Sequence, residues 1–495
     1  MGHLKKLAGQ TIIYGVSSIL GRIINYFLVP LHTTLFLKNE LGVVSYFYGY
    51  TALALILITF GMETTFFRFA TKDDNPKTYH VAATSVIFIS LLFSIFISIG
   101  TPYLSVFLTS KFNIAINARM IYWLAAIVFI DGATAIPFAR LRLENRPIKF
   151  AAAKTIAILG NIGLQLLFLV LFPAIHNQEF LVGLKPMVDS IYNPNLGIEY
   201  IFLANLISNS VWFILLAKEF LQIKLSLNWN VLKPMLFYAL PILITGFAGW
   251  VTNELDKVAV AEWSKGGVFA QGVYSQTFKL GALMMLAIQA FRYAVEPFFF
   301  SQAKDKQAPA LFAKTMHFYF IMALLIMLAV CLNIDLIADL LLRRPEYRVA
   351  LFLVPIIMFG KLLFGVYINI SIWFKLKDQT SYGILYTLIG AIITFTGNYF
   401  FLGRFGYISS AVTIVVAYFV MSLVSYRMGK KRYPVPYNFK PLIVYTIIVL
   451  TLIYFGYHIT LSNMWLDCAL NIIVTLAFIA ITYSIERKRI FQPIE

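Results

Sequence analysis

The sequence predicts an all-α integral membrane protein with about 14 transmembrane helices. Three observations lead to this prediction: the composition, the recurrence of long apolar segments and the distribution of basic residues. Of the 495 residues, 60% are hydrophobic and 13% are charged, whereas a soluble globular domain is roughly a quarter charged. The mean hydropathy of +0.80 also indicates that lipid surrounds most of the chain.

Apolar segments long enough to cross a bilayer recur along the whole sequence. A transmembrane helix needs about twenty mostly apolar residues. The longest connection between such segments, from Pro173 to Tyr200, is too short to fold as a separate domain. The predicted spans lie near residues 11–36, 42–69, 79–107, 115–141, 151–173, 200–223, 231–253, 266–294, 309–332, 347–373, 382–402, 406–427, 441–459 and 464–484.

Basic residues are distributed unevenly between the two ends of these spans. With the N-terminus placed inside, 26 of the 40 Lys and Arg residues fall at cytoplasmic ends and 9 at the opposite ends. Because cytoplasmic loops of membrane proteins are enriched in Lys and Arg, this asymmetry predicts an even number of spans with both termini in the cytoplasm. The same rule accounts for most of the net charge of +18, so nucleic acid is not expected as a partner.

The sequence offers no sign of a cofactor or a metal site. Cys331 and Cys468 lie far apart and have no Cys-x-x-Cys or Cys/His spacing around them. There is also no Gly-x-x-x-x-Gly-Lys sequence to bind ATP. Any work done by the protein is therefore expected to draw on an ion gradient or on the membrane potential.

A weak internal repeat appears when residues are compared at an offset of 230. Five of the twelve positions from 42 to 53 are identical to their counterparts, among them Gly42 with Gly272 and Ser45 with Ser275. Such a repeat predicts two six-helix halves related by an axis along the membrane normal, with a substrate site between them. Chance similarity of two apolar helices is the alternative. The predicted domains are residues 1–225 and 226–430, each a six-helix lobe, and residues 431–495, which hold two additional helices and a cytoplasmic tail.

Polar residues form stripes on the first and seventh spans, which occupy equivalent places in the two halves. The stripe on the first span includes Arg22 and Asn25, and the stripe on the seventh span ends at Asp256, with Lys257 beside it. Their spacings place each stripe along one face of a helix. Two such stripes facing each other would line a central cavity.

Further charged residues lie within or near other spans. A charge in the middle of a span costs about 2.5–3.5 kcal/mol by insertion scales, so each should face protein or water. Cations in a cavity bind phosphate or pyrophosphate, whereas lone carboxylates suit ion coupling or pairing with those cations. For each residue, a purely structural ion pair is the alternative. The candidate substrate-binding residues are Arg22, Asn25, Lys257, Lys279, Arg292 and Lys361; the candidate ion-coupling or charge-pairing residues are Glu63, Asp131 and Asp256; no catalytic residue is expected.

Three short stretches carry a resemblance to a known family. They are Leu7–Thr11 leading into Gly21-Arg22, Pro137–Arg142, and Asp256–Val260 leading into Gly272–Ser275. With the number and spacing of the spans, they resemble the polysaccharide-transport, or O-antigen flippase, branch of the multidrug/oligosaccharidyl-lipid/polysaccharide exporter superfamily.

The resemblance implies two six-helix lobes around a central cavity plus two C-terminal helices, in a bacterial cytoplasmic (inner) membrane. It also implies a cycle between inward-open and outward-open states. The cargo would be a sugar chain on polyprenyl pyrophosphate, with the headgroup received by cationic cavity residues. By position, Arg22 fits a first-helix cavity arginine, and Asp256 fits the acidic residue before the Gly-x-Tyr-Ser turn.

The expected function is therefore secondary transport: a flippase that moves polyprenyl-pyrophosphate-linked oligosaccharide across the membrane by alternating access, for cell-surface polysaccharide synthesis. A lipid II flippase and a multidrug or cation antiporter are alternatives of the same class, although cationic cavity residues favour an anionic cargo. A membrane-embedded glycan polymerase or ligase is the alternative of another class, and the short 173–200 loop argues against an enzyme. The expected partners are the lipid-linked glycan and membrane lipids, and the candidate protein partners are a polysaccharide polymerase and glycosyltransferases.

Overall fold

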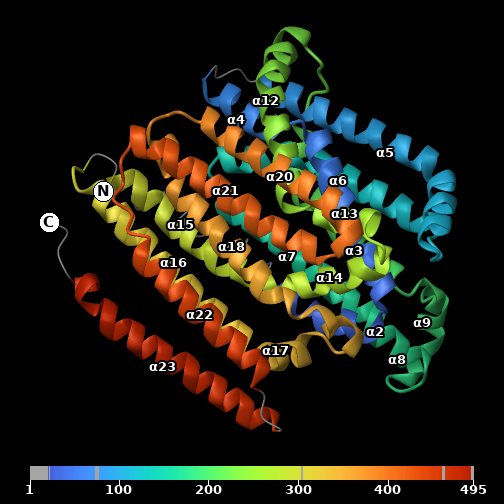
Figure 1. The fold of residues 1–495 in the computed structure, drawn as a ribbon. Helices are drawn as coiled ribbons and strands as arrows, with labels where there is room; N and C mark the ends of the chain where they lie inside the picture. Colours follow the sequence, from blue (N-terminus) through green and yellow to red (C-terminus); the bar gives the residue numbers. More distant parts are fainter. Residues whose placement is uncertain (1–20, 22, 73–76, 303–304, 460–462, 492–495) are drawn as a thin grey trace. The chain divides into compact units, whose positions relative to one another are not determined.

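The protein is all-α, as the sequence predicted (Figure 1). This computed structural model describes residues 21, 23–72, 77–302, 305–459 and 463–491, and those residues contain no β-strand. Eleven of their helices are long and apolar enough to cross a membrane. A twelfth span follows if the helices Gly267–Gly281 and Met284–Phe300, bent by 45° at the break between them, are counted as one. The prediction of an all-α integral membrane protein is confirmed.

Each predicted span coincides with a helix in the described part of the chain. The eighth predicted span is the bent pair, and the first and sixth are represented by the shorter apolar helices Ile23–Leu35 and Glu199–Leu215. The N-terminal part of the first predicted span lies outside the described residues. The extents of the first and sixth spans therefore differ most from the prediction.

The chain forms two compact units. Unit 1 holds the described residues of Met1–Leu28 and Tyr46–Trp250, and unit 2 holds those of Val29–Ser45 and Val251–Glu495. The division between them falls inside three helices, α2 (Leu28–Leu35), α3 (Lys38–Thr59) and α12 (Trp229–Asn253). The predicted partition into lobes at residues 225 and 430 remains a prediction.

Unit 1 is built on α5 and α6, which pack along each other (Figure 1). A side chain at Gly132 of α6 would overlap the Ser90 hydroxyl of α5, so the glycine permits this close approach. Most of α6 is buried, in keeping with a helix that is apolar on nearly all faces. Besides its parts of α3 and α12, unit 1 contains α4 (Met62–Lys72), α5 (Lys77–Phe112), α6 (Ala118–Leu143), α7 (Pro147–Leu166), a π-helical turn (Leu167–Leu171), α8 (Phe172–His176), two 3-10 turns (Val182–Leu184 and Pro194–Leu196), α9 (Lys185–Ile191), α10 (Glu199–Leu215) and α11 (Ala217–Leu221).

Unit 2 is built on α18, which packs against α14, α16 and α21. Gly365 of α18 leaves room for the Tyr319 ring of α16, whose hydroxyl donates a hydrogen bond to the Leu362 carbonyl (3.1 Å). The helices are α2 (Leu28–Leu35, of which Leu28 belongs to unit 1), α13 (Asp256–Trp263), α14 (Gly267–Gly281), α15 (Met284–Gln302), α16 (Ala308–Leu332), α17 (Ile334–Leu341), a 3-10 helix (Pro345–Ala350), α18 (Leu353–Ile370), α19 (Ile372–Leu376), α20 (Ser381–Phe405), α21 (Ile408–Arg432), α22 (Lys440–His458) and α23 (Met464–Phe491).

The C-terminal helices α22 and α23 pack on α16 within unit 2 (Figure 1). The buried Glu486 carboxylate of α23 accepts a hydrogen bond from the Tyr445 hydroxyl of α22 (2.9 Å) and lies 3.0 Å from Nε2 of His317 on α16. Nearer the other end of α23, the Asn471 amide donates to the Leu332 carbonyl of α16 (2.8 Å). Lipid tails leave little hydrophobic drive between helices, so such polar contacts attach the pair firmly.

A reciprocal contact between α3 and α14 matches the internal repeat. A side chain at Gly42 would overlap the Val268 carbonyl oxygen, and one at Gly272 would overlap the Lys38 carbonyl oxygen. Both glycines, and both carbonyl residues, are 230 positions apart in the sequence. A contact in which each partner repeats the role of the other is typical of two-fold symmetry. This geometry favours duplication over chance similarity as the origin of the repeat.

Gly272→Ala is expected to lower the stability of the protein by about 1–3 kcal/mol, because a backbone carbonyl cannot move aside as a flexible side chain can. The thermal unfolding midpoint of detergent-purified protein measures this effect. The matched control is Gly163→Ala in α7, where no atom lies within 4 Å of the added carbon. Equal midpoints for the two variants would contradict the close backbone contact.

The predicted topology can be checked with single cysteines. Both native cysteines are buried, and both Glu179, before α9, and Gln222, before α12, are exposed. In intact cells, Glu179→Cys should react with a membrane-impermeant maleimide, and Gln222→Cys should react only after the membrane is permeabilised. The reverse pattern would place the N-terminus outside.

Candidate functional site

Asp256 occupies a buried position at the first turn of α13. Its side chain is 5% exposed. One carboxylate oxygen accepts a hydrogen bond from the Tyr274 hydroxyl of α14 (2.8 Å), and the other accepts from the Lys257 backbone N–H (3.0 Å). The carboxylate also lies at a helix N-terminus, where the backbone dipoles favour negative charge. These contacts stabilise an acidic group that would otherwise be costly in apolar surroundings.

Lys361 lies near the midpoint of α18 and is almost fully buried, with 4% exposed. Its ammonium is 5.0 Å from the centroid of the Phe278 ring and 5.9 Å from that of the Tyr418 ring. It attracts the carboxylates of Asp256 and Glu254 and is repelled by Lys257. Aromatic faces and nearby carboxylates both stabilise a desolvated cation. Lys361 is therefore part of an internal network of charges.

Two further lysines belong to the same network. Lys257 forms an ion pair with Glu254, and the Lys279 ammonium donates a hydrogen bond to Oε1 of Gln276 (2.9 Å). Lys257 and Lys279 also repel each other electrostatically. We refer to Glu254, Asp256, Lys257, Lys279 and Lys361 as the unit 2 charge cluster. It holds three cations and two carboxylates, and its excess positive charge suits an anionic ligand.

The unit 2 charge cluster unites four of the predicted site residues, and other predicted residues lie apart from it. Arg292 of α15 is half exposed and lies 3.5 Å from the Glu296 carboxylate, which also contacts the Lys375 ammonium at 2.7 Å. Asn25 is exposed in unit 1. Arg22 falls outside the described residues. Arg292 thus belongs to an ion-pair group shared between α15 and α19.

The remaining predicted carboxylates lie in unit 1. Glu63 of α4 pairs with the Arg142 guanidinium of α6 at 2.5 Å. Asp131, near the midpoint of α6, accepts a hydrogen bond from the Asn209 amide of α10 (2.8 Å). Lys154 of α7 interacts electrostatically with both carboxylates. These residues form a second group of charges, which shares no member with the unit 2 charge cluster.

The two groups are related through the internal repeat. Asp131 and Lys361 are 230 positions apart and lie near the midpoints of α6 and α18, respectively. The same offset therefore places opposite charges at corresponding depths of corresponding helices. The partners of Asp131 lie in unit 1, and those of Lys361 lie in unit 2.

Lys154, which lies two turns inside α7, is not among the site residues predicted from the sequence. Also not predicted from the sequence are the aromatic and amide partners of the charges, namely Phe138, Asn209, Trp212, Tyr274, Phe278 and Tyr418. One signal was available: Asn205, Asn209 and Trp212 are spaced four and three apart, on one face of α10. The remaining partners come from separate helices, which no local spacing relates.

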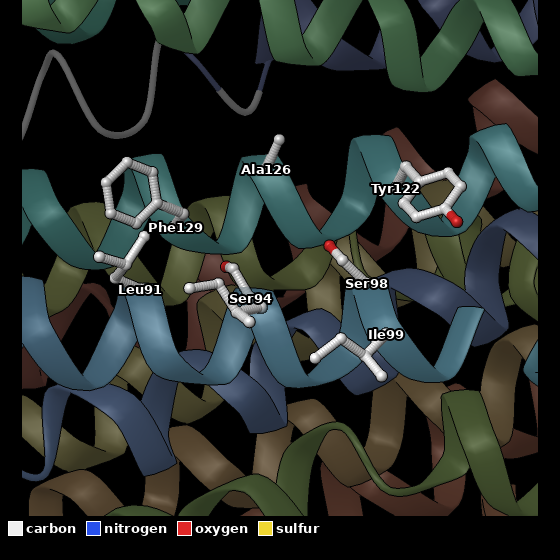
Figure 2. Close-up of a pocket in the computed structure, with 8 residues that line it drawn as sticks. Leu91, Ser94, Ser98, Ile99, Tyr122, Ala126 and Phe129 are labelled. Atoms are coloured by element: carbon white, nitrogen blue, oxygen red, sulfur yellow. The ribbon is translucent and has the colours of Figure 1, made fainter.

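Two grooves, one in each unit, are lined mainly by apolar side chains. Figure 2 shows one in unit 1, between α5 and α6, where Ser94, Ser98 and Ala126 lie among larger side chains such as Tyr122 and Phe129. Its volume is about 460 Å³. Another, of about 550 Å³, runs between α20 and α21 in unit 2. Neither of these two grooves is lined by a charged side chain, so neither suits a phosphate headgroup.

No protein-family model matches the chain, and no curated protein matches its sequence. Solved structures do match its fold. One described as the lipid II flippase MurJ in an inward closed conformation superimposes with a TM-score of 0.72 at 13% sequence identity, covering 96% of this chain and 99% of the other. An inward-facing multidrug resistance MATE family transporter of the MOP superfamily gives a TM-score of 0.60 at 15% identity, covering 88% and 96%. The chain shares the fold of these transporters.

This similarity extends over almost the whole chain. A MATE structure in complex with MaD3S gives a TM-score of 0.57 at 14% identity and covers 90% of this chain. At such identities the comparison describes the fold alone. The fold thus agrees with the resemblance noted from short motifs.

A double-mutant cycle tests whether Asp256 and Lys361 depend on each other. Asp256→Asn and Lys361→Met should each lower the thermal stability, because each leaves a buried charge with fewer partners. The double variant should lose less than the sum of the two losses, by about 0.5–3 kcal/mol. Combining Lys361→Met with Asp189→Asn, at an exposed position of α9 in unit 1, provides an additive control. Additivity in both cycles would show that Asp256 and Lys361 do not interact.

Proposed function

We propose that this protein is a secondary transporter that flips polyprenyl-pyrophosphate-linked oligosaccharide across a cytoplasmic membrane by alternating access. The observation that carries the proposal is the fold match to a lipid II flippase over 96% of this chain and 99% of that one. The MATE structures leave 10–12% of this chain unmatched. The greater coverage supports a lipid-linked cargo over a small drug.

The charges of unit 2 support an anionic headgroup as the bound part of the cargo. Lys257, Lys279 and Lys361 outnumber the two carboxylates near them. A pyrophosphate adds negative charge and acceptor oxygens, and charge-assisted hydrogen bonds to ammonium groups are strong. A cationic drug would meet an unfavourable field there. Arg22 remains a predicted contributor from the first span.

The two lysines at the margin of the cluster are the better candidates for direct contact. Lys257 and Lys279 are partly buried, whereas Lys361 is almost fully buried between aromatic rings. We assign headgroup binding to Lys257 and Lys279. Lys361 would then hold Asp256 in place and attract the headgroup electrostatically without contacting it.

Lipid II is the second candidate cargo, because the structure that shares this fold over 99% of its own length is a lipid II flippase. Lipid II and oligosaccharide carriers share the polyprenyl pyrophosphate and differ in the attached sugars. The shared chemistry would engage the same lysines. Only transport of the two lipids side by side separates these candidates.

Among the described residues, the segment between α7 and α10 holds only short helices and turns, with no separate folded domain. Within this segment, His176 of α8 pairs with Asp189 of α9 at 2.6 Å, and Lys185 of α9 contacts the same carboxylate at 3.1 Å. These contacts lower the pKa of Asp189 below its usual value, first through the His176 hydrogen bond. An aspartate engaged in this way links α8 to α9 and is a poor general base.

Transport can be tested in vesicles that contain the purified protein and a fluorescent polyprenyl-pyrophosphate oligosaccharide. Lys279→Met should reduce the crossing rate about tenfold or more, since a hydrogen bond to a charged group is worth about 1.5–3 kcal/mol. The matched control is Lys306→Met, an exposed lysine between α15 and α16, which should leave the rate unchanged. Parallel assays with labelled lipid II identify the preferred cargo.

Failure of both lipids to cross under any imposed gradient would overturn the proposal. A change in glycan length without crossing would instead indicate a polymerase. An equal loss of crossing rate in Lys279→Met and Lys306→Met would show that Lys279 has no special role in binding.

A further inference from the structure

Unit 1 contains a carboxylate that headgroup binding does not use. Asp131 lies near the midpoint of α6, at the depth where a charge is most costly. Its contacts come from other helices of the same unit. The Asn209 amide of α10 donates a hydrogen bond to it at 2.8 Å. One neutral donor does not compensate a carboxylate in apolar surroundings, so Asp131 depends on a charged neighbour or on a proton.

Lys154 of α7 is the charged neighbour. Its ammonium lies 4.1 Å from the centroid of the Phe138 ring and 3.9 Å from that of Trp212. It attracts Asp131 electrostatically and also interacts with Glu63 and Arg142. The two aromatic faces stabilise the ammonium whether or not Asp131 carries a charge. Lys154 can therefore remain cationic through a change at Asp131.

The other groups around Asp131 are neutral or weakly acidic. Tyr48 of α3 interacts electrostatically with the carboxylate, and its hydroxyl accepts a hydrogen bond from the Asn205 amide of α10 (2.9 Å). From α5, the Ser90 hydroxyl lies beside Gly132. Thus α3, α5, α7 and α10 together present one cation, one tyrosine and uncharged polar groups to this part of α6.

The charged groups continue toward the basic end of α6. Glu63 and Arg142 form their ion pair there, with side chains 41% and 35% exposed. Lys154 interacts with both members of this pair and with Asp131. The order Glu63 and Arg142, then Lys154, then Asp131 leads from an exposed ion pair to the middle of the helix. Proton relays in membrane proteins consist of Asp, Glu and His side chains, so Glu63 is the proton carrier of this group, whereas Arg142 and Lys154 supply only positive charge.

We propose that Asp131 is a proton-binding site, loaded from the end of unit 1 that carries Glu63 and Arg142. On loading, the Asp131 carboxylate takes up one proton and becomes a neutral carboxyl, and the same proton is lost on release. Lys154 stays an ammonium throughout, so the local charge rises by one. Loading removes the attraction between α6 and α7, which allows these helices to shift relative to each other.

A proton fits this site better than a metal cation. The described residues contain no group of three or more His, Cys, Asp or Glu side chains that could hold a metal ion. A metal cation beside Asp131 would also be repelled by the Lys154 ammonium. As the coupling site of the transporter, Asp131 rests on the proposed function; as a proton-binding group, it does not.

Infrared difference spectroscopy of the reconstituted protein tests proton binding without any cargo. The wild type should gain a carboxylic acid C=O band as the pH is lowered, and Asp131→Asn should lose that band. The matched control, Asp189→Asn, removes an exposed carboxylate of α9 and should keep the band. Lys154→Met provides a second variant: without the ammonium, the band should persist to a pH about 1–3 units higher. An unchanged band in Asp131→Asn, or an unmoved one in Lys154→Met, would overturn the proposal.

Transport in vesicles tests the coupling role separately. Asp131→Asn should abolish the acceleration caused by an imposed pH gradient while leaving slow downhill crossing of the fluorescent lipid. Full retention of the pH-gradient effect would overturn the coupling role. If no lipid crosses even in the wild type, the proposed function fails, and the infrared band still decides whether Asp131 binds a proton.

Discussion

The cost of placing charge in apolar surroundings governs the interior of this protein. The buried or partly buried charges Asp131, Asp256 and Lys361 each have partners supplied by other helices. Asp256 is held by Tyr274 of α14, Lys361 lies between the rings of Phe278 and Tyr418, and Asp131 accepts from Asn209. Because lipid offers no competing hydrogen bonds, these partners must be in place for the helices to pack as they do.

The same constraint makes the charges informative about function. A protein that needed only to fold could replace each buried pair with apolar residues of similar size at little cost in stability. Retaining cations with too few carboxylates in unit 2 is consistent with the binding of an anion. Retaining a lone carboxylate with a cation and amides in unit 1 is consistent with a group that changes its charge. We thus propose headgroup binding for unit 2 and proton binding for unit 1.

Close contact between helix backbones is the second constraint, and its repetition within the chain favours an origin by duplication. Side chains at Gly42 and Gly272 would overlap the carbonyl oxygens of Val268 and Lys38, respectively, and the two contacts are related by the repeat offset of 230. Only glycine allows carbonyl and Cα to approach so nearly, so both copies of the helix retain it. The contact lies at the start of α3 and α14, where a bulky residue would separate the helices.

The sequence by itself determined the all-α membrane fold, because lipid requires long apolar helices and each leaves a run of about twenty residues that can be counted. It also marked Asp131, Asp256 and Lys361 as exceptions within those runs. Only the tertiary structure decided their partners. Lys154 reaches Asp131 from another helix, and Tyr274 reaches Asp256 across a turn, since packing brings together residues whose local patterns carry no shared signal. The sequence had grouped Arg292 with Lys257, Lys279 and Lys361 because all four are cations. In the structure, Arg292 instead pairs with Glu296 on its own helix.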